Sequence, residues 1–238
     1  MTPRYSLVIP LYNEAGNLLP LLESILAVLT PLTNESLEII LIDDGSTDAT
    51  PAEIAAAVTR WPVCRSLRHA TNRGQADSLL HGLKEARGEI LLTIDGDGQN
   101  DPKDFPVLLS AVESGTVDVA CGWRVDRNDR WLRRVLSRVG NAVRRAVLGD
   151  RLHDGGCQLR AMRRAVVDVL FPVPFMQSFL PSIAHDAGLR VAEFPVRHHP
   201  RVRGQAHFGL RQLWWEPAAA LLTVRRHMKR RRQTRSAC

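Results

Sequence analysis

Three groups of polar residues in the first half of the chain have types and spacings that suit chemistry. They are Tyr12-Asn13-Glu14, Asp43-Asp44-Gly45-Ser46 and Asp95-Gly96-Asp97-Gly98-Gln99. Asp95 and Asp97 are hard oxygen ligands two residues apart on a glycine-rich turn, so they could chelate one Mg²⁺ or Mn²⁺ and leave positions for phosphate oxygens. Gln99 could add a carbonyl ligand. A solvated acidic turn is the alternative, since an Asp-x-Asp pair by itself is a weak signal.

The carboxylates of Asp43 and Asp44 have two possible uses. One is to accept hydrogen bonds from a nucleobase or ribose, with Glu14 doing the same from the neighbouring strand end. The other is to form the turn, with Ser46 or Thr47 capping the helix that follows. The residue types alone leave both uses open.

The elements that must position these groups alternate between strand and helix. Short apolar runs rich in β-branched residues predict the strands, and a helical period predicts the helices. Strands are expected at 5–9, 37–42, 63–68, 89–94 and 117–120, and helices at 15–29, 48–59, 75–86 and 102–113. Asp101 is expected to cap the last of these helices rather than to bind a ligand. Helices between the strands imply right-handed crossovers and a largely parallel α/β sheet, covered on both faces.

The place of the polar groups agrees with this sheet, because ligands bind beyond the carboxyl ends of parallel strands. All three groups follow an expected strand. The chain has no Gly-x-Gly-x-x-Gly after a strand and no Gly-x-x-x-x-Gly-Lys-Ser/Thr. Dinucleotide redox chemistry and P-loop hydrolysis are therefore disfavoured.

Composition sets broader limits. The chain has 238 residues, of which 45% are hydrophobic and 4 are cysteines. This length fits one domain or a tightly joined pair. The cysteines form no Cys-x-x-Cys pair, which disfavours a zinc ribbon or a disulfide scaffold and favours a reducing compartment. Apolar stretches are short or interrupted, so no membrane-spanning helix is predicted.

Charge is distributed unevenly along the chain. Residues 1–118 carry 8 basic and 17 acidic residues, whereas residues 119–224 carry 17 basic and 8 acidic residues. Residues 225–238 add 7 basic residues and no acidic one, so the net charge of +7 lies in this last segment. Random surface charge could explain either half alone. The alternative is an acidic half, a basic half and a basic tail with separate tasks.

Two basic segments suit an anionic surface. Residues 130–148 combine a helical period of apolar residues with six arginines, as in a helix that lies on a membrane or binds phosphate. A core-facing helix with a solvated basic face has the same pattern. In the tail, Trp214 and Trp215 suit the headgroup level and the Lys/Arg cluster could tether the chain to an anionic leaflet. A disordered basic tail is the alternative there.

Four motifs resemble, in order and spacing, those of the inverting family-two glycosyltransferases of GT-A fold. They are VIPLYNE at 8–14, IDDGSTD at 42–48, NRGQ at 72–75 and TIDGDGQNDP at 93–102. The closest resemblance is to the dolichol-phosphate mannose synthase-like branch, which moves a sugar from a nucleotide donor to a polyprenyl phosphate. It implies a Rossmann-like, mostly parallel sheet flanked by helices, followed here by a basic C-terminal helical tail.

The resemblance also assigns donor-side roles. The nucleoside pocket and its neighbouring loop would be lined by Pro10, Tyr12, Glu14, Asp43, Asp44 and Gln75. Mg²⁺ or Mn²⁺ on the donor diphosphate would be held by Asp95, Asp97 and Gln99, with Asp97 acting in catalysis. A diphosphate could not approach these carboxylates without a cation, which also stabilises the leaving nucleoside diphosphate.

Acceptor-side motifs continue the resemblance in the basic half. They are CGWR at 121–124, HDGGCQLR at 153–160, EFPV at 193–196 and HHPR at 198–201. Arginines at these places bind the acceptor phosphate in the branch, a role carried over to Arg124 and Arg201, with Arg127, Arg134 and Arg203 as further candidates. A phosphate is already an anionic nucleophile and needs no strong base. For a hydroxyl acceptor, Asp154 would be the candidate base.

The chain departs from the branch at three places. Gln177-Ser178 stand where the branch often has His-Arg, and Ala206-His207-Phe208 stand where it often has Ser-Lys-Tyr. Many relatives continue into two transmembrane helices, and none is predicted here. A different phospholipid acceptor is therefore an alternative.

Together these features predict a GT-A domain over 1–210, with a nucleotide-sugar and metal half at 1–118 and an acceptor half at 119–210. An amphipathic, basic tail is expected at 211–238. The expected function is inverting transfer of a sugar from a metal-bound UDP- or GDP-sugar to a membrane polyprenyl phosphate, by a cytoplasmic enzyme peripheral on the inner face of the cell membrane. The alternatives are transfer to a hydroxyl of a lipid or glycan, and a catalytically silent nucleotide-sugar-binding protein. Nucleic acid is not expected as a partner, because the basic tail lacks interleaved stacking aromatics.

Overall fold

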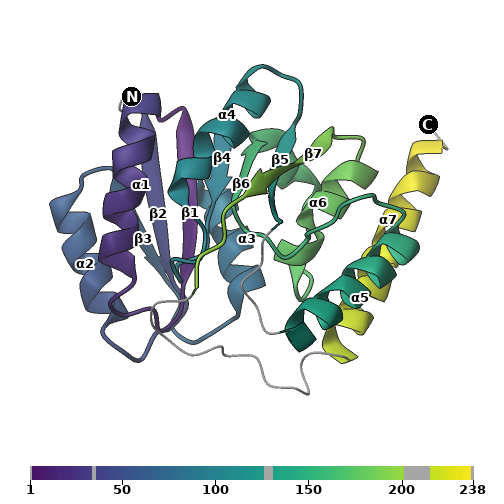
Figure 1. The fold of residues 1–238 in the computed structure, drawn as a ribbon, viewed down its shortest axis with the longest axis horizontal. Helices are drawn as coiled ribbons and strands as arrows, with labels where there is room; N and C mark the ends of the chain where they lie inside the picture. Colours follow the sequence, from purple (N-terminus) through teal and green to yellow (C-terminus); the bar gives the residue numbers. More distant parts are fainter. Residues whose placement is uncertain (1, 34–35, 126–130, 201–214, 237–238) are drawn as a thin grey trace.

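A seven-stranded sheet forms the middle layer of the molecule, in the order β3-β2-β1-β4-β6-β5-β7 (Figure 1). The computed structural model describes residues 2–33, 36–125, 131–200 and 215–236, and for 131–138, 215, 235 and 236 it describes the backbone alone. The strands are β1 (Tyr5–Leu11), β2 (Leu37–Asp43), β3 (Cys64–Arg68), β4 (Ile90–Thr93), β5 (Val119–Arg124), β6 (Arg160–Arg163) and β7 (Val191–Val196). Every pairing is parallel except those of β6, which runs antiparallel to both β4 and β5.

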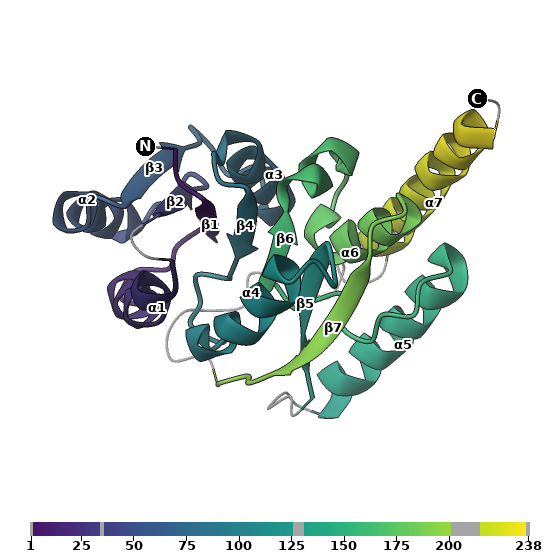
Figure 2. The ribbon, with the colours of Figure 1, turned by 90° about the horizontal axis from the view of Figure 1, so that it is seen from above.

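Helices cover both faces of the sheet, as Figure 2 shows from above. They are α1 (Leu18–Thr33), α2 (Thr50–Arg60), α3 (Gln75–Glu85), α4 (Phe105–Glu113), α5 (Trp131–Leu148), α6 (Met176–Asp186) and α7 (Trp215–Ser236), with 3-10 turns η1 (Pro102–Asp104) and η2 (Arg164–Val169). One buried cluster joins the sheet to α1, α2 and α4, and a second joins it to α3, α6 and α7. The alternation of strand and helix therefore gives the α/β architecture that the sequence predicts.

The strand register brings the polar groups to one edge. Leu11 of β1 pairs with Asp43 of β2, and Val8 of β1 pairs with Thr93 of β4. Because these strands are parallel and adjacent, the residues that follow each of them emerge at the same edge of the sheet. The predicted meeting of the three acidic groups is therefore a property of the fold.

The C-terminal helix α7 packs on the body of the molecule. Ala220, Leu221, Val224 and Met228 are buried in the cluster that contains α6, and α7 also contacts α5. The spacing of these residues places them along one stripe of the helix, and the basic residues from Arg225 onward lie outside that stripe. Among the described helices, none has the length and apolar content needed to cross a bilayer. The predicted boundary at residue 210 lies outside the described residues.

Two local expectations have different outcomes. Asp101 accepts a hydrogen bond from the backbone amide of Lys103 at 3.0 Å, so the predicted cap is confirmed, although it opens the 3-10 turn η1 rather than an α-helix. The alternative that Ser46 or Thr47 caps the next helix is not realised. Helix α2 begins at Thr50 with Ala49 as its N-cap residue, so both lie before the cap, and Ser46 Oγ accepts a hydrogen bond from the amide of Asn13.

Candidate active site

The loops after β1 and β2 are tied to each other. Asn13, with a left-handed φ of 54°, accepts a hydrogen bond from the amide of Thr47 at 2.8 Å through its side-chain oxygen. The amide of Glu14 donates to Thr50 Oγ1 at 2.8 Å, and Glu14 Oε2 accepts from the side chain of Asn17 at 2.8 Å. These contacts hold the half-buried Glu14, together with Pro10 and Tyr12 just before it, beside the end of β2.

Asp44 is committed to the loop that leads into α3. Its two oxygens accept hydrogen bonds from the amides of Arg73 and Gly74 at 2.9 and 2.8 Å. The imidazole Nδ1 of the buried His69 lies 2.8 Å from the same carboxylate. Sequence analysis missed His69, whose only signal is its place one residue after the strand β3. Asp44 therefore positions the 72–75 loop and has little capacity left for a nucleoside.

Asp43 is more available than its neighbour. Its Oδ1 accepts from the amide of Ser46 at 2.8 Å, whereas its Oδ2 meets only the ion pair with Arg68 at 3.2 Å among the described residues. The Arg68 side chain is 64% exposed, so a ligand could displace it readily. Of the two adjacent carboxylates, Asp43 is the better placed to accept a hydrogen bond from a bound nucleoside.

Asp95 and Asp97 form the acidic end of β4. Asp97 is buried, and Asp95 is half-buried with its Oδ1 accepting a hydrogen bond from Gln75 Nε2 at 2.6 Å. Burial and the charge of Asp97 raise the pKa of Asp95 to about 7, although the positive charges of Arg124 and Arg160 oppose the rise. A divalent cation between the two carboxylates would relieve this repulsion. Their chemistry thus fits Mg²⁺ or Mn²⁺.

The protein supplies few ligands beyond this pair. The Gln99 side-chain amide donates to the backbone carbonyl of His199 at 3.3 Å, so it is turned toward the 198–199 segment. In the part of the chain that the structure describes, no three His, Cys, Asp or Glu side chains gather into a metal-binding cluster. A site of one or two carboxylates completed by substrate phosphates is typical of Mg²⁺. The remaining ligands of such a cation would therefore have to come from a bound ligand or from water.

On the acceptor side, Arg124 at the end of β5 is held by Asp154. Its Nε and Nη2 donate to the two carboxylate oxygens at 2.7 and 2.9 Å, and both side chains are largely buried. Burial disfavours the charge of Arg124, but the hydrogen bonds to Asp154 outweigh it and raise the pKa of the guanidinium. Arg124 therefore stays positive in a poorly solvated place, which suits an anion.

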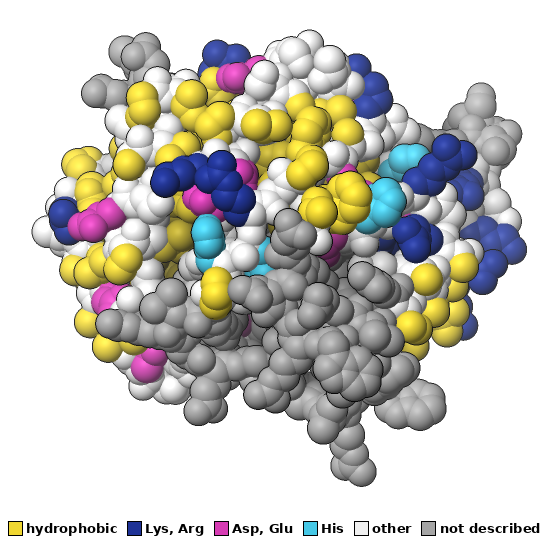
Figure 3. Space-filling view, viewed as in Figure 1, with side chains coloured by type: hydrophobic (Ala, Val, Ile, Leu, Met, Phe, Trp, Pro, Cys, Tyr) yellow, Lys and Arg dark blue, Asp and Glu magenta, His cyan; other side chains and the backbone are white. Residues whose placement is uncertain are grey.

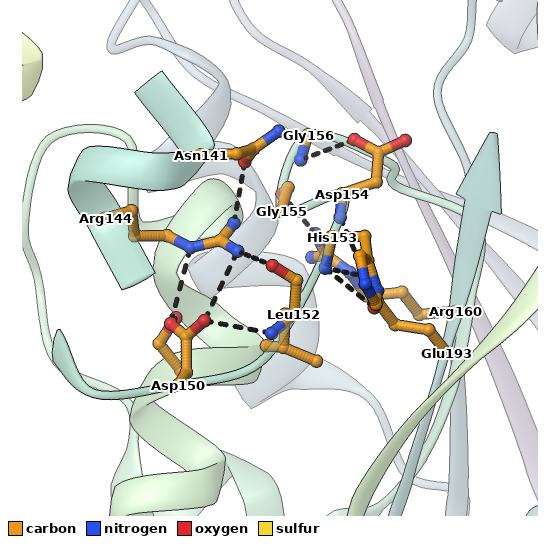
Figure 4. Close-up of polar contacts among 11 residues, drawn as sticks. Asn141, Arg144, Asp150, Leu152, His153, Asp154, Gly155, Gly156, Arg160 and Glu193 are labelled. Atoms are coloured by element: carbon orange, nitrogen blue, oxygen red, sulfur yellow. Dashed lines mark hydrogen bonds and ion pairs between the residues drawn. The ribbon is translucent and has the colours of Figure 1, made fainter. Parts of the chain in front are cut away.

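The loop that carries Asp154 is clamped from several sides, as Figure 4 shows. Glu193 of β7 accepts hydrogen bonds from the amides of His153 and Asp154, and Arg144 of α5 donates to the carbonyl of Leu152 at 2.6 Å. Arg144 also pairs with the buried Asp150 at 3.3 Å. These contacts fix the direction of Asp154 toward Arg124.

Gly155 lets the clamp close. A Cβ at this position would lie 1.9 Å from Arg144 Nη1 and 2.7 Å from the carbonyl oxygen of Ser178. Its own carbonyl accepts a hydrogen bond from Arg160 at 3.1 Å. Arg160 is completely buried, and its Nε and Nη1 have no hydrogen-bond partner among the described residues. Sequence analysis quoted Arg160 within a motif but did not single it out.

The structure therefore joins most of the predicted site residues at one edge. At or just beyond the carboxyl ends of neighbouring strands lie Pro10, Tyr12, Glu14, Asp43, Asp95 and Asp97. Arg124, which pairs with Asp154, lies near enough to influence Asp95. Arg127, Arg201, Arg203 and the segment 206–208 lie outside the described residues, as does the side chain of Arg134.

A twisted, mostly parallel sheet with carboxylates at its carboxyl edge and helices on both faces is the GT-A arrangement. Solved structures with this fold include a glucosyl-3-phosphoglycerate synthase from Mycobacterium tuberculosis in complex with Mn²⁺ and UDP-glucose, with a TM-score of 0.69 and 22% identity over 93% of this chain and 79% of that chain. A mannosyltransferase from Pyrobaculum calidifontis, in complex with GDP-mannose and Mn²⁺, has a TM-score of 0.63 and 22% identity over 87% of this chain and 59% of that chain.

Sequence comparison defines the family. The model of glycosyl transferase family 2 matches residues 6–171, so the chain belongs to this family. An undecaprenyl-phosphate 4-deoxy-4-formamido-L-arabinose transferase of Edwardsiella ictaluri is 35% identical over 87% of the chain and 64% of its own length. A dodecaprenyl-phosphate galacturonate synthase of Rhizobium johnstonii is 36% identical over 86% of the chain and 62% of its own length. The chain thus spans slightly less than two thirds of these relatives.

Proposed function

We propose that the protein is an inverting glycosyltransferase that moves a sugar from a nucleotide diphosphate sugar to a polyprenyl phosphate. The observation that carries the proposal is the meeting of two unlike charge sites at one edge of the sheet. Asp95 and Asp97 repel each other and favour a cation, whereas Arg124 is a buried cation that favours an anion. A metal-bound diphosphate and an acceptor phosphate are ligands of the matching charges.

The proposed donor site uses the ends of β1, β2 and β4. Pro10, Tyr12, Glu14 and Asp43 would hold the nucleoside, while Asp44 and Gln75 would support the loop and the metal aspartate beside it. Mg²⁺ or Mn²⁺, when bound by Asp95 and Asp97 with Gln99 nearby, would neutralise the charge that develops on the leaving diphosphate. The relatives crystallised with Mn²⁺ and a nucleotide sugar support this assignment.

The proposed acceptor site centres on Arg124, and the sequence motif adds Arg201, which lies outside the described residues. An acceptor phosphate oxygen would attack the anomeric carbon from the face opposite the diphosphate, and the bond to the diphosphate oxygen would break as the new bond forms. The configuration is inverted by this single displacement. Positioning and charge neutralisation can supply most of the rate, because the phosphate is already ionised.

The pairing of Asp154 favours a phosphate over a hydroxyl acceptor. Both of its oxygens accept hydrogen bonds from Arg124, at 2.7 and 2.9 Å, so the carboxylate is engaged by a cation and is not presented to the proton of an incoming hydroxyl. In the proposed mechanism Asp154 orients Arg124 and does not act as a general base. The names of the relatives, which act on undecaprenyl and dodecaprenyl phosphate, point to the same acceptor class.

The chain is also proposed to sit peripherally on the inner face of the cell membrane, where such acceptors are found. Val139 and Val143 of α5 and Leu222 of α7 are each 48% exposed. On the same helix as Leu222, α7 exposes the basic residues Arg225, Arg226, Lys229 and Arg230. Figure 3 shows Lys and Arg side chains beside apolar ones on this side of the molecule.

A transfer assay tests the proposed reaction. The protein is incubated with undecaprenyl phosphate, Mn²⁺ and a panel of labelled UDP- and GDP-sugars, and label entering the organic phase is measured. Transfer that EDTA abolishes is the expected result. No transfer from any donor, or transfer unaffected by EDTA, would contradict the proposal.

Membrane binding is tested separately by flotation with vesicles of phosphatidylglycerol. Changing Arg225, Arg226, Lys229 and Arg230 to Gln retains the helix and its buried stripe but removes four charges. Since each basic residue near an anionic surface contributes roughly 1 kcal/mol, binding should weaken by at least about 100-fold. Unchanged flotation of this variant would show that α7 is not the tether.

A further inference from the structure

Three polar side chains form a hydrogen-bonded chain from α6 through α3 to the end of β4. Gln177 Nε2 donates to Gln75 Oε1 at 3.2 Å, and Gln75 Nε2 donates to Asp95 Oδ1 at 2.6 Å. Helices α3 and α6 pack against each other on one face of the sheet (Figure 2). The contact thus links a helix of the basic half of the chain to a carboxylate of the acidic half.

The direction of this chain of hydrogen bonds is set by the carboxylate. An ionised Asp95 can only accept, so Gln75 must turn its NH₂ group toward Asp95 and its carbonyl toward Gln177. Gln177 must then turn its own NH₂ group toward Gln75 and its carbonyl away. Both glutamine side chains have a single orientation that satisfies Asp95.

An unpaired atom at the far end agrees with this orientation. Gln177 is 5% exposed, and its Oε1 is buried with no hydrogen-bond partner among the described residues. A buried carbonyl without a donor is unfavourable. The amide is nevertheless arranged with its donor toward Gln75, which indicates that holding Gln75 is the contact that the fold retains at this position.

We propose that Gln75 and Gln177 are positioning residues for the divalent cation, acting through Asp95. This inference rests on the proposed function, because it takes Asp95 as a metal ligand. The amide of Gln75 occupies one carboxylate oxygen and leaves the other for the cation, and Gln177 fixes the amide. This gives a role to Gln177, which stands where the branch often has a histidine. Partners of this kind typically change metal affinity 10- to 100-fold when they are lost.

Metal binding by the full chain tests the proposal without relying on activity. Mn²⁺ is titrated into the protein, alone and with UDP or GDP, and free Mn²⁺ is measured by electron paramagnetic resonance. Methionine replaces each glutamine because it has a similar length and no strong donor. Gln75→Met should raise the Kd for Mn²⁺ by about 10- to 100-fold, and Gln177→Met by about tenfold.

The double variant tests whether the two residues act in series. If Gln177 acts only through Gln75, the pair of substitutions should weaken binding no more than Gln75→Met alone. Additive losses would overturn the relay. So would a Gln177→Met variant whose Kd stays within about twofold of the wild-type value.

Gln158→Met is the matched control. Gln158 is also 5% exposed with an unpartnered Oε1, but its Nε2 donates to the carbonyl of Gly156 at 3.3 Å. It should lose thermal stability comparably to Gln177→Met and bind Mn²⁺ as the wild type does. A wild-type chain that binds no Mn²⁺ in any condition would overturn the metal site and the relay together, whereas tight binding by every variant overturns the relay alone.

Discussion

Buried charge is treated in opposite ways at the carboxyl end of β4, in the proposed donor site, and in the loop 150–156 beside Arg124, in the proposed acceptor site. At the carboxyl end of β4, burial and the charge of Asp97 raise the pKa of Asp95 to about 7, because they outweigh the nearby arginines. In the acceptor loop, Arg124 is matched by Asp154 and Arg144 by Asp150, each within hydrogen-bonding or ion-pair distance. One region needs an external cation. In the other, each arginine already has a carboxylate partner, and Asp154 would keep Arg124 oriented toward an incoming anion.

The largest effect on the transfer rate is expected at the Asp95 and Asp97 carboxylates, whose charges the protein does not fully neutralise. Asp97→Ala should lower the transfer rate by at least about 100-fold, because the metal and its electrostatic stabilisation of the leaving group are lost. The same variant should show no Mn²⁺-dependent rise in melting temperature. Transfer at more than a tenth of the wild-type rate would place the metal elsewhere.

The acceptor pair should respond differently to the loss of each partner. Arg124→Met removes the guanidinium that pairs with the buried Asp154, so it should cost about 3 kcal/mol of unfolding free energy and raise KM for the polyprenyl phosphate about tenfold or more. Asp154→Asn leaves a free guanidinium and should raise that KM less. The comparison is measured by urea unfolding and by KM for each substrate, with KM for the nucleotide sugar as the internal reference. Equal changes in both KM values would remove the distinction between the regions.

A carboxylate at the opposite edge of the sheet gives a reference for pH. Burial opposes the charge of Glu38, but hydrogen bonds from Ser6, Arg65 and the amide of Arg87 outweigh it and lower its pKa. Its contribution to stability is therefore complete above the unfolded pKa of about 4.3 and is lost as pH falls through the lower folded value. Glu38→Gln should cost about 1.5 kcal/mol at pH 7 and flatten the acid limb of the stability curve, measured by urea unfolding between pH 3 and 7. An acid limb as steep as that of the wild type would contradict this assignment.

The smallest effect is expected at Asp150, one of the residues that hold the loop carrying Asp154. Ser182 Oγ donates to Asp150 Oδ2 at 2.5 Å, and the same oxygen pairs with Arg144. Ser182→Ala should cost about 1 kcal/mol of stability, since Arg144 still pairs with Asp150. KM for the polyprenyl phosphate should stay unchanged. A rise in that KM would show that the clamp is less rigid than its contacts suggest.

The sequence predicted the sheet and its functional edge because alternation of strand and helix depends on local patterns. It could not predict contacts between distant residues. The cap suggested for Ser46 or Thr47 is absent because helix α2 begins later, at Thr50, and the hydroxyl of Ser46 instead holds the distant Asn13. Strand β6 was missed because RAMR has four residues and an arginine at each end, without a clear apolar pattern. The link between Gln75 and Asp95 depends on how α3 packs against the sheet, which spacing does not reveal.

The antiparallel strand β6 has a consequence for how the chain is made. It lies between β4 and β5, although it follows β5 in the sequence. Until residues 160–163 leave the ribosome, β4 therefore presents an open edge of unpaired backbone groups, which is prone to pairing with other chains. A chain split at residue 118 would keep that edge exposed. The acidic and basic halves are therefore interleaved in one cooperative folding unit, and neither should be stable when expressed alone.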